Sequence, residues 1–216
     1  MQFKRLIIII VGLLFFSNIC VADGFDISIK ETMDLMNQAK KSYQIKDCLT
    51  RFEKIAAANP NRWEAQYHHA YALLTYAIWE EGRNQTENIN TAEKIIQKII
   101  ALKGEMSEIY VLQAYLYQAK IFLNKSIPNV ISCGSKTNKF LEKAIETNPN
   151  NPRAYYQQGM MLYYAPAIFG GSKKKALVKF TIAKNKYEWE LKNQKNQAFP
   201  NWGRDENLKM IKKCNS

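Results

Sequence analysis

The stretch NPNNPRAYYQQGMML at residues 148–162 decides the fold, because an earlier part of the chain repeats it. Residues 59–73 read NPNRWEAQYHHAYAL. Both stretches begin with Asn-Pro, place a small residue ten positions after the proline (Ala70 and Gly159), and put leucine three positions further on. Two unrelated helices would seldom share this register, so the spacing predicts a chain built from repeated helical units.

A second pattern predicts how the repeated units pack. Four segments carry a small residue, a larger apolar residue four positions later and another apolar or small residue three positions beyond that. The three sets are Cys48, Ala92, Thr137 and Ala176; Phe52, Ile96, Leu141 and Phe180; and Ile55, Ile99, Ala144 and Ala183. Spacings of four and three keep such residues on one face of an α-helix. We expect each stripe to be buried against a neighbouring helix pair.

This arrangement is typical of tetratricopeptide repeats, which are helix pairs of about 34 residues with small residues where the two helices cross. The small position of the first helix falls at Met36, Ala70, Ala114 and Gly159, with gaps of 34, 44 and 45 residues. The prediction is an all-α superhelix of about four hairpins in a single domain, 23–216. The units are expected at about 27–60, 61–104, 105–149 and 150–192, with a capping helix in 200–214.

Asn-Pro and glycine positions set the expected helix ends. The predicted helices are 27–42, 45–58, 62–81, 88–102, 106–123, 136–147, 151–164, 172–192 and 204–213. The insertion at 124–134 contains Pro128 and Gly134, so it is predicted not to form one regular helix.

The first 22 residues have the features of a secretory signal peptide. Lys4 and Arg5 precede an apolar run at 6–16, and Cys20-Val21-Ala22 offers a cleavage site near Ala22. The run is shorter than the roughly 20 residues that span a bilayer, so we expect cleavage, a periplasmic location and no stable membrane span afterwards. Two of the twelve excess positive charges lie in this leader, and the remainder carries a net charge of +10.

Three cysteines remain after cleavage: Cys48, Cys133 and Cys214. An odd number in an oxidising compartment allows at most one internal disulfide. Cys48 occupies a small-residue site between helices, where a buried thiol is expected. A Cys133–Cys214 disulfide and a pair of free thiols are both compatible with the sequence.

The region 148–214 contains three further motifs. These are NPNNPRAY at 148–155, YYAPAIFGGSKKKA at 163–176 and FPNWG at 199–203, followed by Cys214. Together they resemble a family of exported tetratricopeptide-repeat proteins of Bacteroidetes-type bacteria. The resemblance implies a periplasmic helical-repeat protein and says little about mechanism.

The residues needed for catalysis or metal binding are scarce. His68 and His69 are adjacent on a predicted helix, so they point about 100° apart and do not form an i, i+4 metal pair. Gly170-Gly171-Ser172-Lys173 lacks the frame of a phosphate-binding loop, and Ser172 is expected to cap the next helix. The lysines are scattered over helix faces without interleaved aromatics, which argues against nucleic acid. We therefore predict no enzymatic activity, no cofactor and no metal site.

Binding is predicted on the concave side of the superhelix, which the first helix of each pair lines. The expected binding residues are Tyr67, Tyr71, Tyr115, Tyr156, Met160 and Tyr163, with Leu74, Val111, Gln118 and Tyr164 beside them and Lys30 and Arg153 at the rim. Tyrosine offers a large rigid contact area with a polar tip, which suits recognition of a protein or peptide partner. The alternative is that the insertion at 124–135 or the terminal helix fills the groove.

The predicted function is accordingly a noncatalytic periplasmic interaction scaffold that binds a peptide, a protein segment or an envelope component. A solute-binding or transport-accessory subunit is the second interpretation, and it predicts an enclosed pocket instead of an open groove. The oligomeric state is left open.

Overall fold

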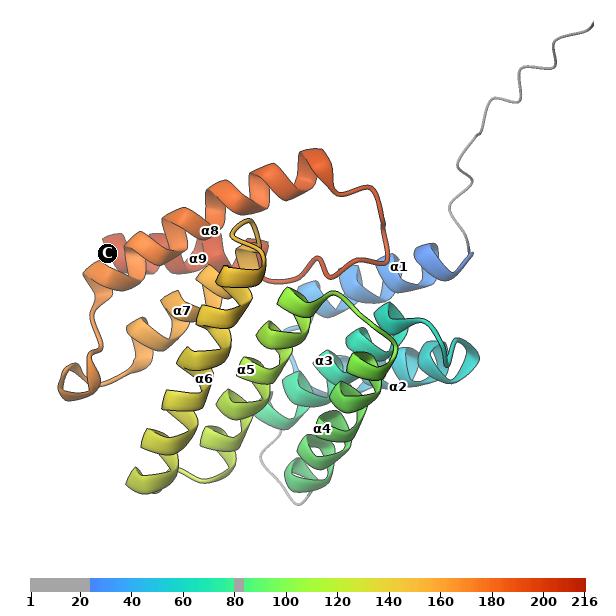
Figure 1. Cartoon of the computed structure of the whole chain (residues 1–216), viewed down its shortest axis with the longest axis horizontal. Coiled ribbons are helices and arrows are strands. Elements are labelled where there is room, and N and C mark those ends of the chain that lie inside the picture. Colours follow the sequence, from blue (N-terminus) through green and yellow to red (C-terminus); the bar gives the residue numbers. More distant parts are fainter. Residues whose placement is uncertain (1–23, 80–83) are drawn as a thin grey trace, which may run out of the picture.

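The computed structural model describes residues 24–79 and 84–216, and the predicted signal peptide lies outside these residues. The described residues form helices and connecting turns without a β-strand (Figure 1). The elements are α1 (Gly24–Gln38), α2 (Ser42–Ala58), α3 (Trp63–Trp79), α4 (Gln85–Ala101), α5 (Met106–Leu123), α6 (Ile127–Thr147), α7 (Pro152–Tyr164), the 3₁₀ turn η1 (Ala167–Phe169), α8 (Lys173–Asn193) and α9 (Arg204–Asn215).

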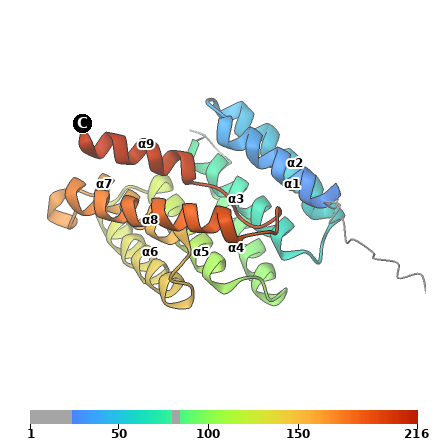
Figure 2. The same cartoon turned by 90° about the horizontal axis from the view of Figure 1, so that it is seen from above.

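The helices form hairpins that stack in chain order. α1 packs on α2, α3 on α4, α5 on α6 and α7 on α8, while α3, α5 and α7 form the inner row and α9 lies along α8 (Figures 1 and 2). The predicted all-α superhelix of helical hairpins with a capping helix is confirmed. No helix among the described residues is both long and apolar enough to cross a membrane.

The predicted stripes form the seams between the hairpins. Phe52, Leu141 and Phe180 are fully buried, and Ile96 is almost so. The small residues at the helix crossings are also buried, because the helix backbones approach closely there. At Gly159 a methyl group in place of hydrogen would overlap the Phe180 ring, which explains the glycine at this position.

The Asn-Pro turns end one hairpin and begin the next. The backbone N–H groups of Asn59 and Asn148 donate to the carbonyls of Ile55 and Ala144, which closes α2 and α6. The side chain of Asn151 then accepts a hydrogen bond from the Arg153 N–H and caps α7, with Pro152 in the first turn where no N–H is needed. The helix ends at Asn59 and Asn148 are therefore common to both turns, while the cap formed by Asn151 and Pro152 is specific to the second.

The prediction that 124–134 does not form one regular helix is wrong for most of this segment, because residues 127–134 belong to α6. α6 begins at Ile127, nine residues before the predicted start at 136, and Pro128 lies in its first turn. Proline is tolerated there because the first N–H groups of a helix have no partner within the helix. The insertion therefore lengthens α6 and does not form a separate loop.

A pair of glycine substitutions tests the seam between α7 and α8. Gly159→Ala should lower the free energy of unfolding by about 1–3 kcal/mol, because the new methyl group overlaps the Phe180 ring. The control is Gly134→Ala in α6, where the nearest atom is the flexible Met161 methyl at 3.9 Å. The control should raise stability by up to about 1 kcal/mol through helix propensity. Equal effects in urea denaturation would contradict this packing.

Candidate functional site

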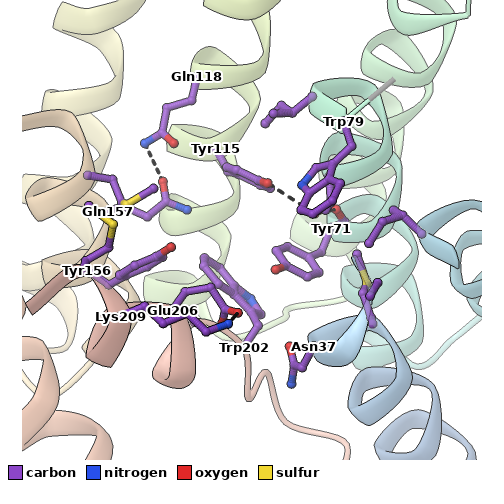
Figure 3. Close-up of a pocket in the computed structure, with 18 of the residues that line it drawn as sticks. Asn37, Tyr71, Trp79, Tyr115, Gln118, Tyr156, Gln157, Trp202, Glu206 and Lys209 are labelled. Carbon is purple, nitrogen blue, oxygen red and sulfur yellow. Dashed lines mark hydrogen bonds and ion pairs between the residues drawn. The ribbon is translucent and has the colours of Figure 1, made fainter. Parts of the chain in front are cut away.

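The C-terminal segment crosses the concave face and fills part of it. The connection between α8 and α9 (residues 194–203) passes over the inner row of helices, and Trp202 inserts between their tyrosines (Figures 2 and 3). The Trp202 ring stacks on Tyr71 with centroids 4.7 Å apart, lies 6.0 Å from Tyr115, and meets Tyr156 edge-on at 6.3 Å. The groove is therefore not fully open, because the connection that leads into the terminal helix is folded into it.

Hydrogen bonds also hold both the side chain and the backbone of Trp202. Its indole Nε1–H donates to the Tyr67 hydroxyl at 3.0 Å, and its backbone carbonyl accepts from the Tyr187 hydroxyl at 3.0 Å. The residue after it, Gly203, has φ of +92°, and a side chain there would meet the Tyr187 hydroxyl at 2.5 Å. Only glycine fits this turn into α9.

A buried charge cluster lies beneath Tyr67. The Tyr67 hydroxyl donates to the Glu108 carboxylate at 3.0 Å, and the Arg153 guanidinium bridges Glu108 and Glu190. Although burial disfavours the charge on Arg153, the two carboxylates raise the pKa of its guanidinium. The prediction that Arg153 lies at the rim is wrong, because its side chain is fully buried. Glu108 and Glu190 compensate its charge there.

His68, the residue after Tyr67 on α3, also holds the connection between α8 and α9. Its Nε2 lies 2.9 Å from the Ala198 carbonyl oxygen, and its ring stacks on Phe52. The side chain is fully buried, and burial lowers its pKa to about 4. His68 is therefore a neutral structural residue at neutral pH. No group of three or more histidine, cysteine or acidic side chains in the described part of the chain could hold a metal ion.

A pocket of about 470 Å³ remains beside Trp202 (Figure 3). It is bounded by α1, by the C-terminal parts of α3, α5 and α7, and by α9. Its apolar lining includes Met36, Ile78, Trp79, Phe122, Met160, Trp202 and Met210. Its polar lining includes Asn37, Tyr71, Tyr115, Gln118, Tyr156, Gln157, Tyr164, Glu206, Lys209 and Lys213. Trp79, Phe122 and Tyr164 are 47%, 52% and 63% exposed, so aromatic rings form the mouth.

Four of the six predicted binding residues line this pocket: Tyr71, Tyr115, Tyr156 and Met160. Tyr67 does not, because it is fully buried beneath Trp202, with Trp63 and Glu108 also in contact with it. Tyr163 also lies outside the lining, and its ring contacts Tyr164 and the Lys173 ammonium group. Leu74 and Val111 are fully buried in the core. Tyr67 has the same spacing from the small residue of its helix as Tyr156, and Tyr163 has the same spacing as Gln118, although Tyr156 and Gln118 line the pocket. This spacing alone therefore does not distinguish covered positions from open ones.

The sequence prediction missed the residues that the C-terminal segment supplies. Trp202, Glu206, Lys209 and Lys213 form one wall of the pocket, and Trp79 and Phe122 form part of its mouth. The FPNWG motif at 199–203 was the available signal, because it places a tryptophan in the connection before the capping helix. Nothing in the sequence shows that this tryptophan meets Tyr67 and Tyr71, more than 100 residues away.

The polar groups of the pocket are side-chain hydroxyls, amides and the charged groups of α9. Burial raises the pKa of Tyr115 to about 12 and raises those of Tyr71 and Tyr156 further, so all three hydroxyls stay neutral. The described residues that line the pocket include neither histidine nor cysteine. Its positive charges, Lys209 and Lys213, lie on α9, where Glu206 contacts Lys209 at 3.3 Å. The pocket thus has a largely apolar lining, with its charged side chains on one side, along α9.

The three cysteines of the described residues are all free thiols. Cys48 and Cys133 are buried, and Cys214 is partly exposed near the start of α8. The structure thus corresponds to the free-thiol alternative for Cys133 and Cys214.

Comparison with solved structures connects this fold to both repeat and ligand-binding proteins. No protein-family model and no curated protein sequence matches the chain. The chain is similar to the HusA haemophore from Porphyromonas gingivalis, with 26% identity, a TM-score of 0.76, and coverage of 88% of this chain and 92% of that one. It also resembles a thermophilic TPR protein of Thermus thermophilus, at 19% identity and a TM-score of 0.55, over 88% and 89% of the two chains. The fold is therefore a tetratricopeptide-like superhelix, and one of the solved structures that share it is a haemophore.

The buried histidine makes stability depend on pH in a defined direction. Because the pKa of His68 falls from 6.5 in the unfolded chain to about 4 in the fold, the unfolded state binds more protons between these values. The His68 contribution is complete above pH 6.5 and should decrease by about 3 kcal/mol as the pH falls to 4. Comparing urea denaturation of the native protein and His68→Gln at pH 7 and pH 4.5 isolates this contribution. A His68→Gln variant that loses as much stability on acidification as the native protein would contradict it.

Proposed function

We propose that the chain is an exported, noncatalytic binding protein that takes a porphyrin such as haem into the pocket beside Trp202. The observation that carries this proposal is an aromatic pocket on a fold that matches a haemophore over about nine-tenths of both chains. The predicted leader at 1–22 supports export to the periplasm or beyond, where a porphyrin scavenger would act.

The size and lining of the pocket fit such a ligand. Its volume of about 470 Å³ falls within the range of roughly 300–1,000 Å³ usual for small-molecule sites. Aromatic rings from α3, α5, α7 and the C-terminal segment offer faces and edges to a flat macrocycle. Lys209 and Lys213 on α9 lie where they could pair with acidic side groups at the edge of the macrocycle.

Binding should depend on the macrocycle more than on iron. Histidine and cysteine, two common protein ligands of haem iron, are absent from the described lining, and burial keeps the hydroxyls of Tyr71, Tyr115 and Tyr156 protonated by raising their pKa. The methionines of the lining offer only neutral thioethers, which are weak acceptors. Stacking and apolar contacts are equally available to a metal-free porphyrin. We therefore expect metal-free protoporphyrin to bind at least as well as haem.

A peptide partner receives less support than the sequence suggested. Trp202 and the segment before it occupy much of the concave face that an extended peptide would need. What remains is a confined pocket, which favours a small molecule. The solute-binding interpretation is thus the better of the two predicted from sequence.

Absorbance titration of residues 23–216 with haem and with metal-free protoporphyrin tests the proposal. Both ligands should give saturable spectral shifts. The double variant Tyr164→Ala/Phe122→Ala should weaken binding by about tenfold or more, because each exposed ring at the mouth contributes on the order of 1 kcal/mol. Tyr43→Ala is the matched control, since Tyr43 is 60% exposed and lies outside the pocket.

Absence of saturable binding to either porphyrin would contradict the proposed function. Equal affinity of the native protein and the double variant would place the ligand elsewhere. Circular dichroism of each variant checks that the helical fold is retained.

A further inference from the structure

The turn that follows α7 is rigidly built. Four backbone hydrogen bonds of 2.8–3.1 Å hold it. The Pro166 carbonyl accepts from the N–H groups of Phe169 and Gly171, the Ala167 carbonyl from Gly170, and the Leu162 carbonyl from Ser172. Gly170 has φ of +85°, and a side chain on Gly171 would collide with the Ala165 carbonyl. The side chain of Ser172 then caps α8 by accepting from the Lys175 N–H. The backbone therefore has one defined conformation.

This rigid turn holds two large apolar side chains out of the core. Ile168 is 84% exposed and Phe169 is 47% exposed, and η1 contributes no buried residue. In Figure 1 the turn projects from the end of the molecule where α7 ends and α8 begins. We call Ile168 and Phe169 the apolar tip. A turn so well hydrogen-bonded does not need these side chains for its own stability, and exposing them to water is unfavourable.

Lysines lie close to the apolar tip in the chain and in the fold. Lys173, Lys174 and Lys175 begin α8, separated from the tip by three residues. The end of α9 brings Lys212 and Lys213 to the same end of the molecule, since Lys213 and Tyr164 line one pocket and Cys214 lies near Lys173. The chain contains no acidic residue between Glu146 and Glu188. An exposed apolar tip beside a cluster of lysines has the composition of a peripheral membrane contact.

We propose that the apolar tip and the lysines around it bind the surface of an anionic phospholipid bilayer. Ile168 and Phe169 would enter the boundary between headgroups and acyl chains, and the five lysines would lie against the phosphates. A protein partner is less favoured, because such interfaces are usually depleted in lysine and this surface contains five.

The same contact would bring the pocket close to the lipid. Tyr164 lines the pocket and lies four residues before Ile168, and Lys213 lines it from α9. A ligand dissolved in the bilayer surface could then enter without crossing bulk water. The lipid contact itself stands independently of the proposed ligand.

Vesicle sedimentation tests the proposal with residues 23–216, so that the apolar leader does not itself bind lipid. The protein should sediment with vesicles containing phosphatidylglycerol and remain in solution with pure phosphatidylcholine. Ile168→Asp/Phe169→Asp should weaken binding at least tenfold. The triple variant Lys173→Gln/Lys174→Gln/Lys175→Gln should weaken binding roughly 100-fold at low salt, and added salt should weaken binding of the native protein in the same way.

The matched control is Ile27→Asp/Leu191→Asp, which adds the same charge at exposed apolar positions on α1 and α8 away from the tip. This control should lose less than threefold. Native protein that binds neither kind of vesicle would overturn the proposal and favour a protein partner. Tip variants that bind as well as the control would overturn it too. Porphyrin titration of the tip variants should be unchanged, which separates failure here from failure of the proposed function.

Discussion

The insertion of Trp202 into the inner row of helices is the contact on which the C-terminal third of the structure depends. One ring stack on Tyr71 and two hydrogen bonds, to Tyr67 and from Tyr187, fix a single residue from three directions. Because Trp202 is fixed, the connection between α8 and α9 must cross the concave face. α9 then covers the last hairpin and supplies the outer wall of the pocket.

The polar groups beneath Trp202 make its position specific. Tyr67, Glu108, Arg153 and Glu190 form a continuous network that is buried except at Glu190, and each polar contact aligns the next. Buried ion pairs add little net stability, since their desolvation cancels much of their attraction, but breaking one leaves an uncompensated charge. The network therefore disfavours any arrangement in which another residue occupies the place of Trp202. A hydrophobic groove alone would accept many occupants.

The repeat architecture could be predicted from the sequence because it rests on local periodicity. The seam residues Phe52, Ile96, Leu141 and Phe180 recur at fixed distances from small residues, and all are buried as expected. The contents of the concave face could not be predicted in this way. Trp202 and Tyr67 are 135 residues apart, and nothing in the local pattern of either specifies the other. The same limit applies to Arg153, whose burial depends on two acids from other helices.

A double-mutant cycle on Trp202 and Tyr67 tests the central claim most directly. Trp202→Phe and Tyr67→Phe each remove one partner of the indole hydrogen bond while retaining an aromatic ring. Urea denaturation of the native protein, both single variants and the double variant gives the coupling free energy. The account predicts a favourable coupling of about 0.5–1.5 kcal/mol. A coupling indistinguishable from zero would mean that the C-terminal segment is not held in the groove by this contact.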